Sequence, residues 1–196
     1  MKIEPVTLAG RHARLEPLAL AHLEALGAVS LDPDIWRWMP APVTNRDELR
    51  AYIEEALRGQ QAGTALPFAT VTQAGNQVVG CTRYGNIDGN HRRVEIGWTW
   101  VARLWQRTAI NTEVKYLMLR HAFESLGCIR VELKTDALNE RSRAAILRLG
   151  AREEGTLRQH FIVAGGRRRD TVYYSILDRE WPEVKARLEA RLARPA

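Results

Sequence analysis

Cysteine, lysine and long apolar runs are all scarce in this chain of 196 residues. The two cysteines, Cys81 and Cys128, lie 47 positions apart, which excludes a disulfide framework and a cysteine-based zinc site and is typical of a reducing compartment. No apolar run approaches the roughly 20 residues of a membrane span, and the start at Met1–Pro5 lacks the apolar core of a signal peptide. We therefore expect a cytoplasmic protein with no membrane partner.

Lysine is confined to Lys2, Lys115, Lys134 and Lys185, so arginine supplies most of the formal net charge of +6. A positive charge favours anionic partners such as nucleic acid or a phosphorylated cofactor, but an arginine excess also follows from a GC-rich genome. The run Arg167–Arg169 follows two glycines and has no interleaved aromatic residues, unlike a stacking platform for nucleic acid. It favours a solvated turn or a contact with an acidic partner, and nucleic acid is not expected.

The pattern of apolar residues predicts one domain over residues 1–196, because hydrophobic residues make up 45% and no linker-like stretch interrupts them. Strands are predicted at 11–17, 68–72, 78–87, 93–101, 128–136, 156–163 and 170–177, and helices at 20–26, 47–58, 110–126, 140–149 and 181–192. The strand–helix–strand order around 100–136 is a crossover, which implies one parallel pair inside a mostly antiparallel sheet. The fold class is therefore α+β, with helices packed on a mixed sheet.

Local signals fix several of these boundaries. Asn45 or Thr44 can cap the helix at 47–58, and Asn139 can cap the helix that ends at Gly150. The first segment, 11–17, is predicted to be an edge strand, and the helix at 20–26 is predicted to end at Gly27. Residues 32–40 are predicted to be irregular.

The strand at 93–101 carries the first candidate for chemistry. Strict alternation places Glu95 on the opposite face from Trp98, and the interior Gly97 indicates a bulge or a close backbone neighbour. Glu95 could act as a general base, directly or through a water, or be an ordinary ion-paired carboxylate. Cys128 has no neighbouring group that would activate a thiolate, so no covalent nucleophile is expected.

The start of the next helix is a candidate phosphate site, since unpaired N–H groups and the positive end of the helix dipole favour a pyrophosphate there. Arg103, Arg107 and the hydroxyl of Thr108 lie close to it in the chain. An ordinary strand-to-helix connection with solvated arginines is the alternative.

Residues 104–113 resemble motif A of the GNAT acetyltransferases, whose loop pattern is [Q/R]-x-x-G-x-[G/A]. Gln106 occupies the first position, while Ala109 and Asn111 stand where two small residues are usual. The segment 139–151 resembles the N-x-x-S-x-x-x-[IL]-x-[KR]-[LM]-G-[FA] block of the same superfamily. The segments at 8–17, 95–98 and 154–177 resemble the branch of ribosomal-protein N-terminal acetyltransferases of the RimJ/RimL type. The likeness covers about residues 8–182.

The resemblance implies the GNAT fold, with splayed strands at the coenzyme A site, and acetyl-CoA as the co-substrate without a metal. It implies Glu95 as the base, Ser142 as the donor of a proton to the departing thiolate, and backbone N–H groups of the bulged strand as the oxyanion donors. Trp36, Trp38 and His160 fall on the acceptor side. The cofactor contacts fall on Trp98, Thr99, Trp100, Val101, Gln106, Arg107, Thr108, Ala109, Ile110, Asn111, Asn139 and Arg143. Plainer roles remain for several: core packing for Trp36, Trp38, Trp98 and Trp100, a local bond for Ser142, and a structural role for His160.

The acceptor is expected to be a primary amine. A terminal α-amine titrates near ~7.7–8 and a lysine side chain near ~10.4, so a modest base suits a protein N-terminus better. A small amine (an antibiotic, amino sugar or polyamine) remains an alternative, and so does a degenerate protein that binds coenzyme A without turnover. The resemblance also makes a homodimer an open expectation.

Overall fold

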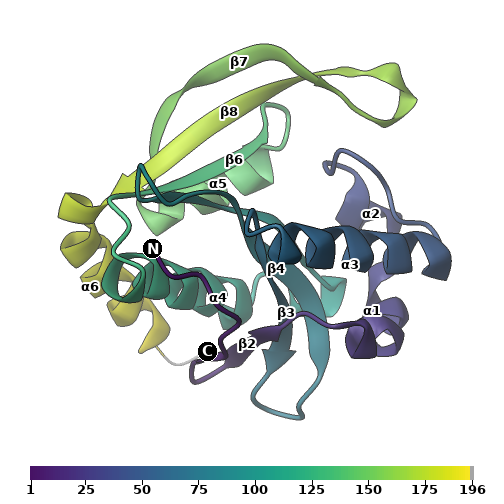
Figure 1. Ribbon diagram of the computed structural model, residues 1–196, viewed down its shortest axis with the longest axis horizontal. Coiled ribbons are helices and arrows are strands. Elements are labelled where there is room, and N and C mark those ends of the chain that lie inside the picture. Colours follow the sequence, from purple (N-terminus) through teal and green to yellow (C-terminus); the bar gives the residue numbers. More distant parts are fainter. Residues whose placement is uncertain (195–196) are drawn as a thin grey trace.

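A mixed sheet of eight strands organises the chain, and the computed structural model describes residues 1–194 (Figure 1). The strands are β1 (Leu8–Ala9), β2 (Ala13–Pro17), β3 (Leu66–Thr72), β4 (Val78–Asp88), β5 (Arg93–Val101), β6 (Arg130–Asp136), β7 (Arg152–Ile162) and β8 (Arg168–Leu177). They lie in the order β1-β2-β3-β4-β5-β6-β8-β7. The pair β5–β6 is parallel and the other pairs are antiparallel, which confirms the predicted crossover.

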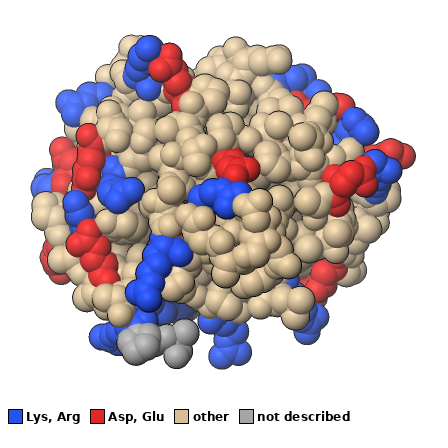
Figure 2. All heavy atoms as spheres, turned by 90° about the horizontal axis from the view of Figure 1, so that it is seen from below, with Lys and Arg blue, Asp and Glu red and all other residues tan. Residues whose placement is uncertain are grey.

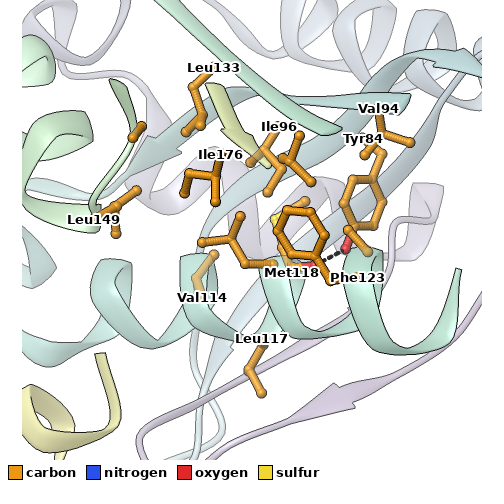
Figure 3. Close-up of a cluster of buried hydrophobic side chains, with 14 of the residues drawn as sticks. Tyr84, Val94, Ile96, Val114, Leu117, Met118, Phe123, Leu133, Leu149 and Ile176 are labelled. Carbon is orange, nitrogen blue, oxygen red and sulfur yellow. Dashed lines mark hydrogen bonds between the residues drawn. The ribbon is translucent and has the colours of Figure 1, made fainter. Parts of the chain in front are cut away.

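Six α-helices cover the sheet, and they divide between its two faces (Figure 1). They are α1 (Leu23–Ser30), α2 (Pro33–Trp36), α3 (Arg46–Gln61), α4 (Ala109–Arg120), α5 (Glu140–Leu149) and α6 (Trp181–Leu192). The larger hydrophobic core joins one sheet face to α4, α5 and α6 and includes Ile146 and Val184. Figure 3 shows Val114, Met118 and Leu149 of the same core. A smaller core joins the other face to α1, α2 and α3. The two cores together set the layered α+β architecture.

Helix caps fall where the sequence predicts them, because a cap depends on its own few residues. The side chain of Asn45 accepts a hydrogen bond from the backbone N–H of Glu48 at 2.9 Å. Asn139 caps α5 in the same way through the N–H of Ser142 at 3.1 Å. Gly150 closes α5 at φ +103°, a backbone conformation that glycine adopts without strain.

Three local predictions are wrong. The first helix does not end at Gly27: α1 begins at Leu23 after a short 3-10 turn and continues to Ser30. Gly27 lies inside α1, facing Leu49 of α3. The segment 32–40 is not wholly irregular, because Asp32 caps the short helix α2. The strand β2 is not the edge, since β1 pairs with its first half.

The turn between β1 and β2 is tied to α4 by one buried carboxylate. Glu113 accepts backbone N–H hydrogen bonds from Arg11, His12 and Ala13 at 2.8, 2.6 and 2.6 Å. Gly10 makes room for it, because a Cβ at that position would stand 2.4 Å from the carboxylate carbon of Glu113. The start of the chain is therefore held against the helix that follows the bulged strand.

Within residues 1–194, no helix has both the length and the apolar composition to cross a membrane. Figure 2 shows one face on which basic and acidic side chains are interspersed around a broad uncharged area. That face offers no continuous basic surface for a nucleic-acid backbone.

Candidate active site

The parallel strands β5 and β6 pair over only their first residues and then separate. The paired positions are Arg93–Glu95 with Arg130–Glu132. Beyond them, the backbone of β5 from residue 96 onward has no partner on its β6 side within the described chain, although it stays paired with β4. Such an opening exposes backbone N–H and C=O groups to a ligand that can lie between the strands like an added strand.

A bulge in β5 lies beside this opening. Gly97 pairs with Arg83 and Trp100 with Cys81, so Trp98 and Thr99 together face a single residue of β4. Trp98 has φ +49°, the left-handed region, which turns the chain out of strict alternation. The hydroxyl of Tyr52 on α3 donates to the carbonyl of Trp98 at 3.3 Å and holds the bulge from the helical side.

The bulge overturns the prediction that Glu95 and Trp98 lie on opposite faces. The guanidinium of Arg83, on the α3 side of β4, lies 4.7 Å from the ring centroid of Trp98. The ammonium of Lys134 lies 5.9 Å from the same ring and 2.8 Å from Glu95, so both residues face one cleft. The extra residue in the bulge reverses the alternation between Gly97 and Thr99.

Glu95 is almost fully buried, with 2% of its surface exposed, and only one of its oxygens carries hydrogen bonds from described residues. Oε2 accepts from the amide of Asn86 at 2.6 Å and from Lys134 at 2.8 Å. Oε1 points toward the backbone of Gly97, where a Cβ would stand 2.8 Å away. The ion pair holds the carboxylate in place, while Oε1 keeps lone pairs for another donor.

Lys134 lies among aromatic rings as well as against Glu95. Its ammonium is 5.9 Å from the ring of Phe161 and 5.6 Å from that of Tyr173, in addition to Trp98. Cations at this distance over aromatic faces are attracted by the ring quadrupole. Lys134, one of only four lysines, has no neighbouring motif in the sequence that would have predicted this role.

Lys115 is a second functional candidate that sequence reasoning missed. Its ammonium donates to the hydroxyl of Thr99 at 2.5 Å, and the residue is 6% exposed. Burial lowers the pKa of Lys115 to about 7, against an opposing effect of the Glu95 charge. A lysine between the apolar residues Val114 and Leu117 of α4, in a chain with only four lysines, was the available signal.

The loop before α4 is held by side-chain hydrogen bonds. Thr108 caps α4: its hydroxyl accepts from the N–H of Ile110 at 3.3 Å and donates to the carbonyl of Trp105 at 2.8 Å. Gln106 donates to the carbonyl of Val101 at 2.8 Å, which joins the loop to the end of β5.

The first turn of α4 has spare hydrogen-bonding capacity. Arg107 has φ +65°, an unusual conformation for a residue with a side chain, and it directly precedes the helix cap. Ala109 and Asn111 lie in the first turn, where N–H groups have no partner inside the helix. The side-chain oxygen of Asn111 is buried and has no hydrogen-bond partner among residues 1–194. These groups fit a polar or anionic ligand at the helix start.

The start of α5 brings Ser142 and Arg143 near the same end of β6. The backbone N–H of Ser142 donates to the side-chain oxygen of Asn139, and no described residue bonds its hydroxyl. Arg143 donates to the hydroxyl of Tyr174 at 3.2 Å and to Glu153 at 3.4 Å. Its guanidinium is therefore already engaged by β7 and β8.

The predicted acceptor residues separate into buried and accessible ones. Trp36 is 3% exposed and packs as the plainer alternative for it expects: its ring lies 5.5 Å from Trp100, and its Nε1 donates to the carbonyl of Ser30 at 2.6 Å. Trp38 is half-buried under the guanidinium of Arg37. His160 lies beside Phe161 at 4.0 Å between ring centroids.

The arginine run at the hairpin tip is not the solvated turn that the sequence indicates. Arg167 forms an ion pair with Asp136, and Arg169 is 5% exposed with its guanidinium 5.5 Å from the ring of Phe161. Only Arg168 points outward. Burial lowers the pKa of Arg169, and the charge of Arg167 adds to that effect.

Comparison with known proteins assigns the family. Residues 12–152 match the model of the acetyltransferase (GNAT) domain. The chain belongs to the GNAT acetyltransferase family. A GCN5-related N-acetyltransferase from Brucella melitensis is 34% identical and superposes with a TM-score of 0.91, covering 98% of this chain and 88% of that one.

Two further relatives of this GNAT acetyltransferase carry more specific names. Mycobacterium smegmatis RimJ, solved in complex with CoA-disulfide, is 25% identical at a TM-score of 0.83, with 95% of each chain covered. The Bacillus subtilis protein named "Putative ribosomal N-acetyltransferase YdaF" is 40% identical over 100 residues, which are 51% of this chain and 54% of that protein. The match therefore spans about half the length of that curated relative. Both the RimJ/RimL likeness and the acyl-CoA-dependent N-acetyltransferase class predicted from the sequence are confirmed at the level of the family.

Proposed function

We propose that this GNAT acetyltransferase moves the acetyl group of acetyl-CoA to the α-amine of a protein N-terminus, in the cytoplasm. The observation that carries the proposal is the opening between β5 and β6, with the bulge at Trp98 on one side and the buried Glu95 beneath it. A terminal amine is favoured over a lysine side chain because about one terminal amine in ten is neutral at pH 7, against fewer than one lysine in a thousand.

The residues present fit coenzyme A. The unpaired backbone of β5 from Trp98 to Val101 suits the amide-rich pantetheine arm, and the start of α4 suits its pyrophosphate. The buried oxygen of Asn111 on that first turn has no partner among residues 1–194; as an acceptor it can bind a donor group of a ligand but not the pyrophosphate oxygens. When bound, acetyl-CoA supplies a thioester whose carbonyl is open to attack by an amine.

Glu95 removes the proton from the acceptor amine through Oε1, directly or through one water. Asn86 and Lys134 hold the other oxygen, which keeps the carboxylate oriented. Backbone N–H groups of the bulged strand stabilise the oxyanion that forms when the amine adds to the carbonyl. The proposed reaction has no covalent intermediate on the protein. Both cysteines are buried free thiols, and burial raises the pKa of each.

Calorimetry and turnover test the proposal together. Titration with acetyl-CoA should give a micromolar dissociation constant, about −8 kcal/mol, and 3′-dephospho-CoA should bind more weakly if arginines contact the ribose phosphate. Free thiol should then appear when peptide N-termini are added. Binding without turnover on any amine would identify a degenerate protein, whereas turnover on polyamines or amino sugars alone would identify a small-molecule enzyme.

Ser142 is proposed to donate the proton that the departing thiolate needs. Ser142→Ala should lower kcat about 10- to 100-fold with less than a threefold change in the affinity for acetyl-CoA, because no described residue depends on the hydroxyl. The measurement is steady-state kinetics beside calorimetry. Ser142→Thr keeps a hydroxyl and should recover part of kcat. An equal loss of kcat and affinity in the alanine variant would reduce Ser142 to a residue that positions the cofactor.

A further inference from the structure

A small cavity separates the α2 segment from the tip of the β7–β8 hairpin, which arches over that part of the molecule in Figure 1. Its volume is about 280 Å³. Most of the wall is apolar: Leu31, Trp36, Met39, Pro42, Val43 and Val163 line it. A cavity of this size holds one side chain up to about the size of an indole, and it is smaller than the roughly 300–1,000 Å³ of whole-ligand pockets.

The remaining wall carries positive charge only. Arg37 and Arg167 line the cavity, and none of its eleven lining residues is acidic. Within residues 1–194, Arg37 has no carboxylate partner and stacks on Trp38 at 5.1 Å. Arg167 and Arg169 share a single carboxylate, that of Asp136. The three arginines Arg37, Arg167 and Arg169 together with this carboxylate therefore have a net charge of +2.

The cavity is a neighbour of the residues that border the cleft of Glu95. The ring of Trp36 lies 5.3 Å from Tyr52, whose hydroxyl bonds to the backbone of the bulge. On the other side, Arg169 reaches the carbonyl of Trp38 at 3.5 Å, and its buried Nε has no hydrogen-bond partner among the described residues. The carboxylate of Asp136 lies 3.9 Å from this Nε, and Arg169 is not among the residues that line the cavity.

We propose that this cavity selects the acceptor peptide: it takes an apolar side chain next to the reacting N-terminus, and Arg37 and Arg167 bind an acidic group that follows it. The inference rests on the proposed function and adds the chemistry of the acceptor. The apolar wall gains the free energy of burying one side chain. The arginines form charge-assisted hydrogen bonds with a carboxylate, which a neutral amide replaces poorly.

Four amidated peptides test the selection: Ser-Phe-Glu-Ala-Ala, Ser-Phe-Gln-Ala-Ala, Ser-Phe-Lys-Ala-Ala and Ser-Ser-Glu-Ala-Ala. The first should have a kcat/KM at least about 10-fold above each of the others, from the loss of either a charged hydrogen bond or a buried ring. Equal values within about twofold across the set would overturn the proposal. Preferential acetylation of free phenylalanine over every peptide would also overturn it, because the acceptor would then be an amino acid.

Two variants locate the effect in this cavity. Arg37→Gln should reduce the preference for glutamate over glutamine at the third position from at least about 10-fold to near unity. Ala164→Trp, at an exposed lining position, should fill the cavity and remove the preference for phenylalanine over serine. Arg50→Gln is the matched control, since Arg50 is an exposed arginine on α3 outside the cavity, and should leave both preferences unchanged. Unaltered preferences in Arg37→Gln and Ala164→Trp would contradict the assignment.

The peptide affinities separate a failure of this inference from a failure of the proposed function. Calorimetry with each peptide in the presence of CoA measures selection without chemistry. Selective binding with no acetyl transfer would retain the cavity assignment and reject the enzyme activity. Acetyl transfer to every peptide without selection would retain the enzyme activity and reject the cavity assignment.

Discussion

Glu95→Gln should lower kcat for acetyl transfer by about 100-fold or more, the effect of removing a general base. The amide oxygen of glutamine can still accept from Asn86 and Lys134, so the side chain should keep its place in the cleft. The nitrogen would replace Oε1, which is the oxygen proposed to accept the proton. The affinity for acetyl-CoA should change by less than about threefold, because the carboxylate lies on the acceptor side. Initial rates at saturating acetyl-CoA, with calorimetry on the same protein, measure both quantities.

Glu132→Gln provides the control for that substitution. Glu132 lies opposite Glu95 in the register of the parallel strands β5 and β6, so it shares the strand environment of the proposed base. Its carboxylate forms ion pairs with Arg93 and Arg130. Its replacement should leave kcat within about threefold. If Glu95→Gln retained the full kcat, Glu95 would be a structural ion-pair partner of Lys134, and the deprotonation of the acceptor would need another group.

Lys115→Met should raise the free energy of unfolding at pH 7 by about 1–4 kcal/mol, as when a buried charge gives way to a well-packed apolar side chain. The pKa of Lys115 is lowered from 10.5 to about 7 by burial, so the native state resists its protonation. Below pH 7 Lys115 is protonated in both the native and the unfolded state, so the native protein is destabilised by the full free energy of burying the charged ammonium. Between pH 7 and about 10.5 the unfolded chain binds more protons, so stability rises with pH by at most about 5 kcal/mol.

Urea unfolding at pH 7 and pH 9.5 measures this linkage. The native protein should gain stability at the higher pH from Lys115, and the methionine variant should lack that increment. Lys185→Met is the control, since Lys185 is accessible and pairs with Glu124 on the surface, and its loss should change stability by less than about 1 kcal/mol. A methionine variant that is less stable at pH 7 would show that the hydrogen bond from Lys115 to Thr99 outweighs the cost of burial.

Sequence reasoning predicted the features that depend on neighbouring residues. The caps at Asn45 and Asn139 and the left-handed Gly150 were predicted because each is decided within one helical turn. The crossover between β5 and β6 followed from the order of strands and the long helix between them. The family likeness added the overall topology, because its blocks extend along most of the chain.

The features that were missed depend on contacts between distant segments. Strict alternation predicted that Trp98 lies on the opposite face from Glu95. This prediction was wrong because the bulge arises from the register of β5 against β4. In the sequence Lys115 is one polar residue of an amphipathic helix, and only the tertiary structure shows its hydrogen bond to the hydroxyl of Thr99. The burial of Arg169 needs Asp136 from another strand. The roles of Glu95 and Ser142 in catalysis stay predictions that the kinetic experiments test.

The extra residue at Trp98 gives β5 one position at which its length can change during evolution. Residues before the bulge place Val94 and Ile96 in the larger core, and residues after it place Trp100 in the smaller one. Deleting Trp98 would restore simple alternation and keep Thr99 and Trp100 on their present faces, because the deletion removes the one residue that the bulge adds. Flattening the bulge without a deletion would instead turn Trp100 toward α4. Homologues that lack one residue at this point are therefore expected to retain both cores.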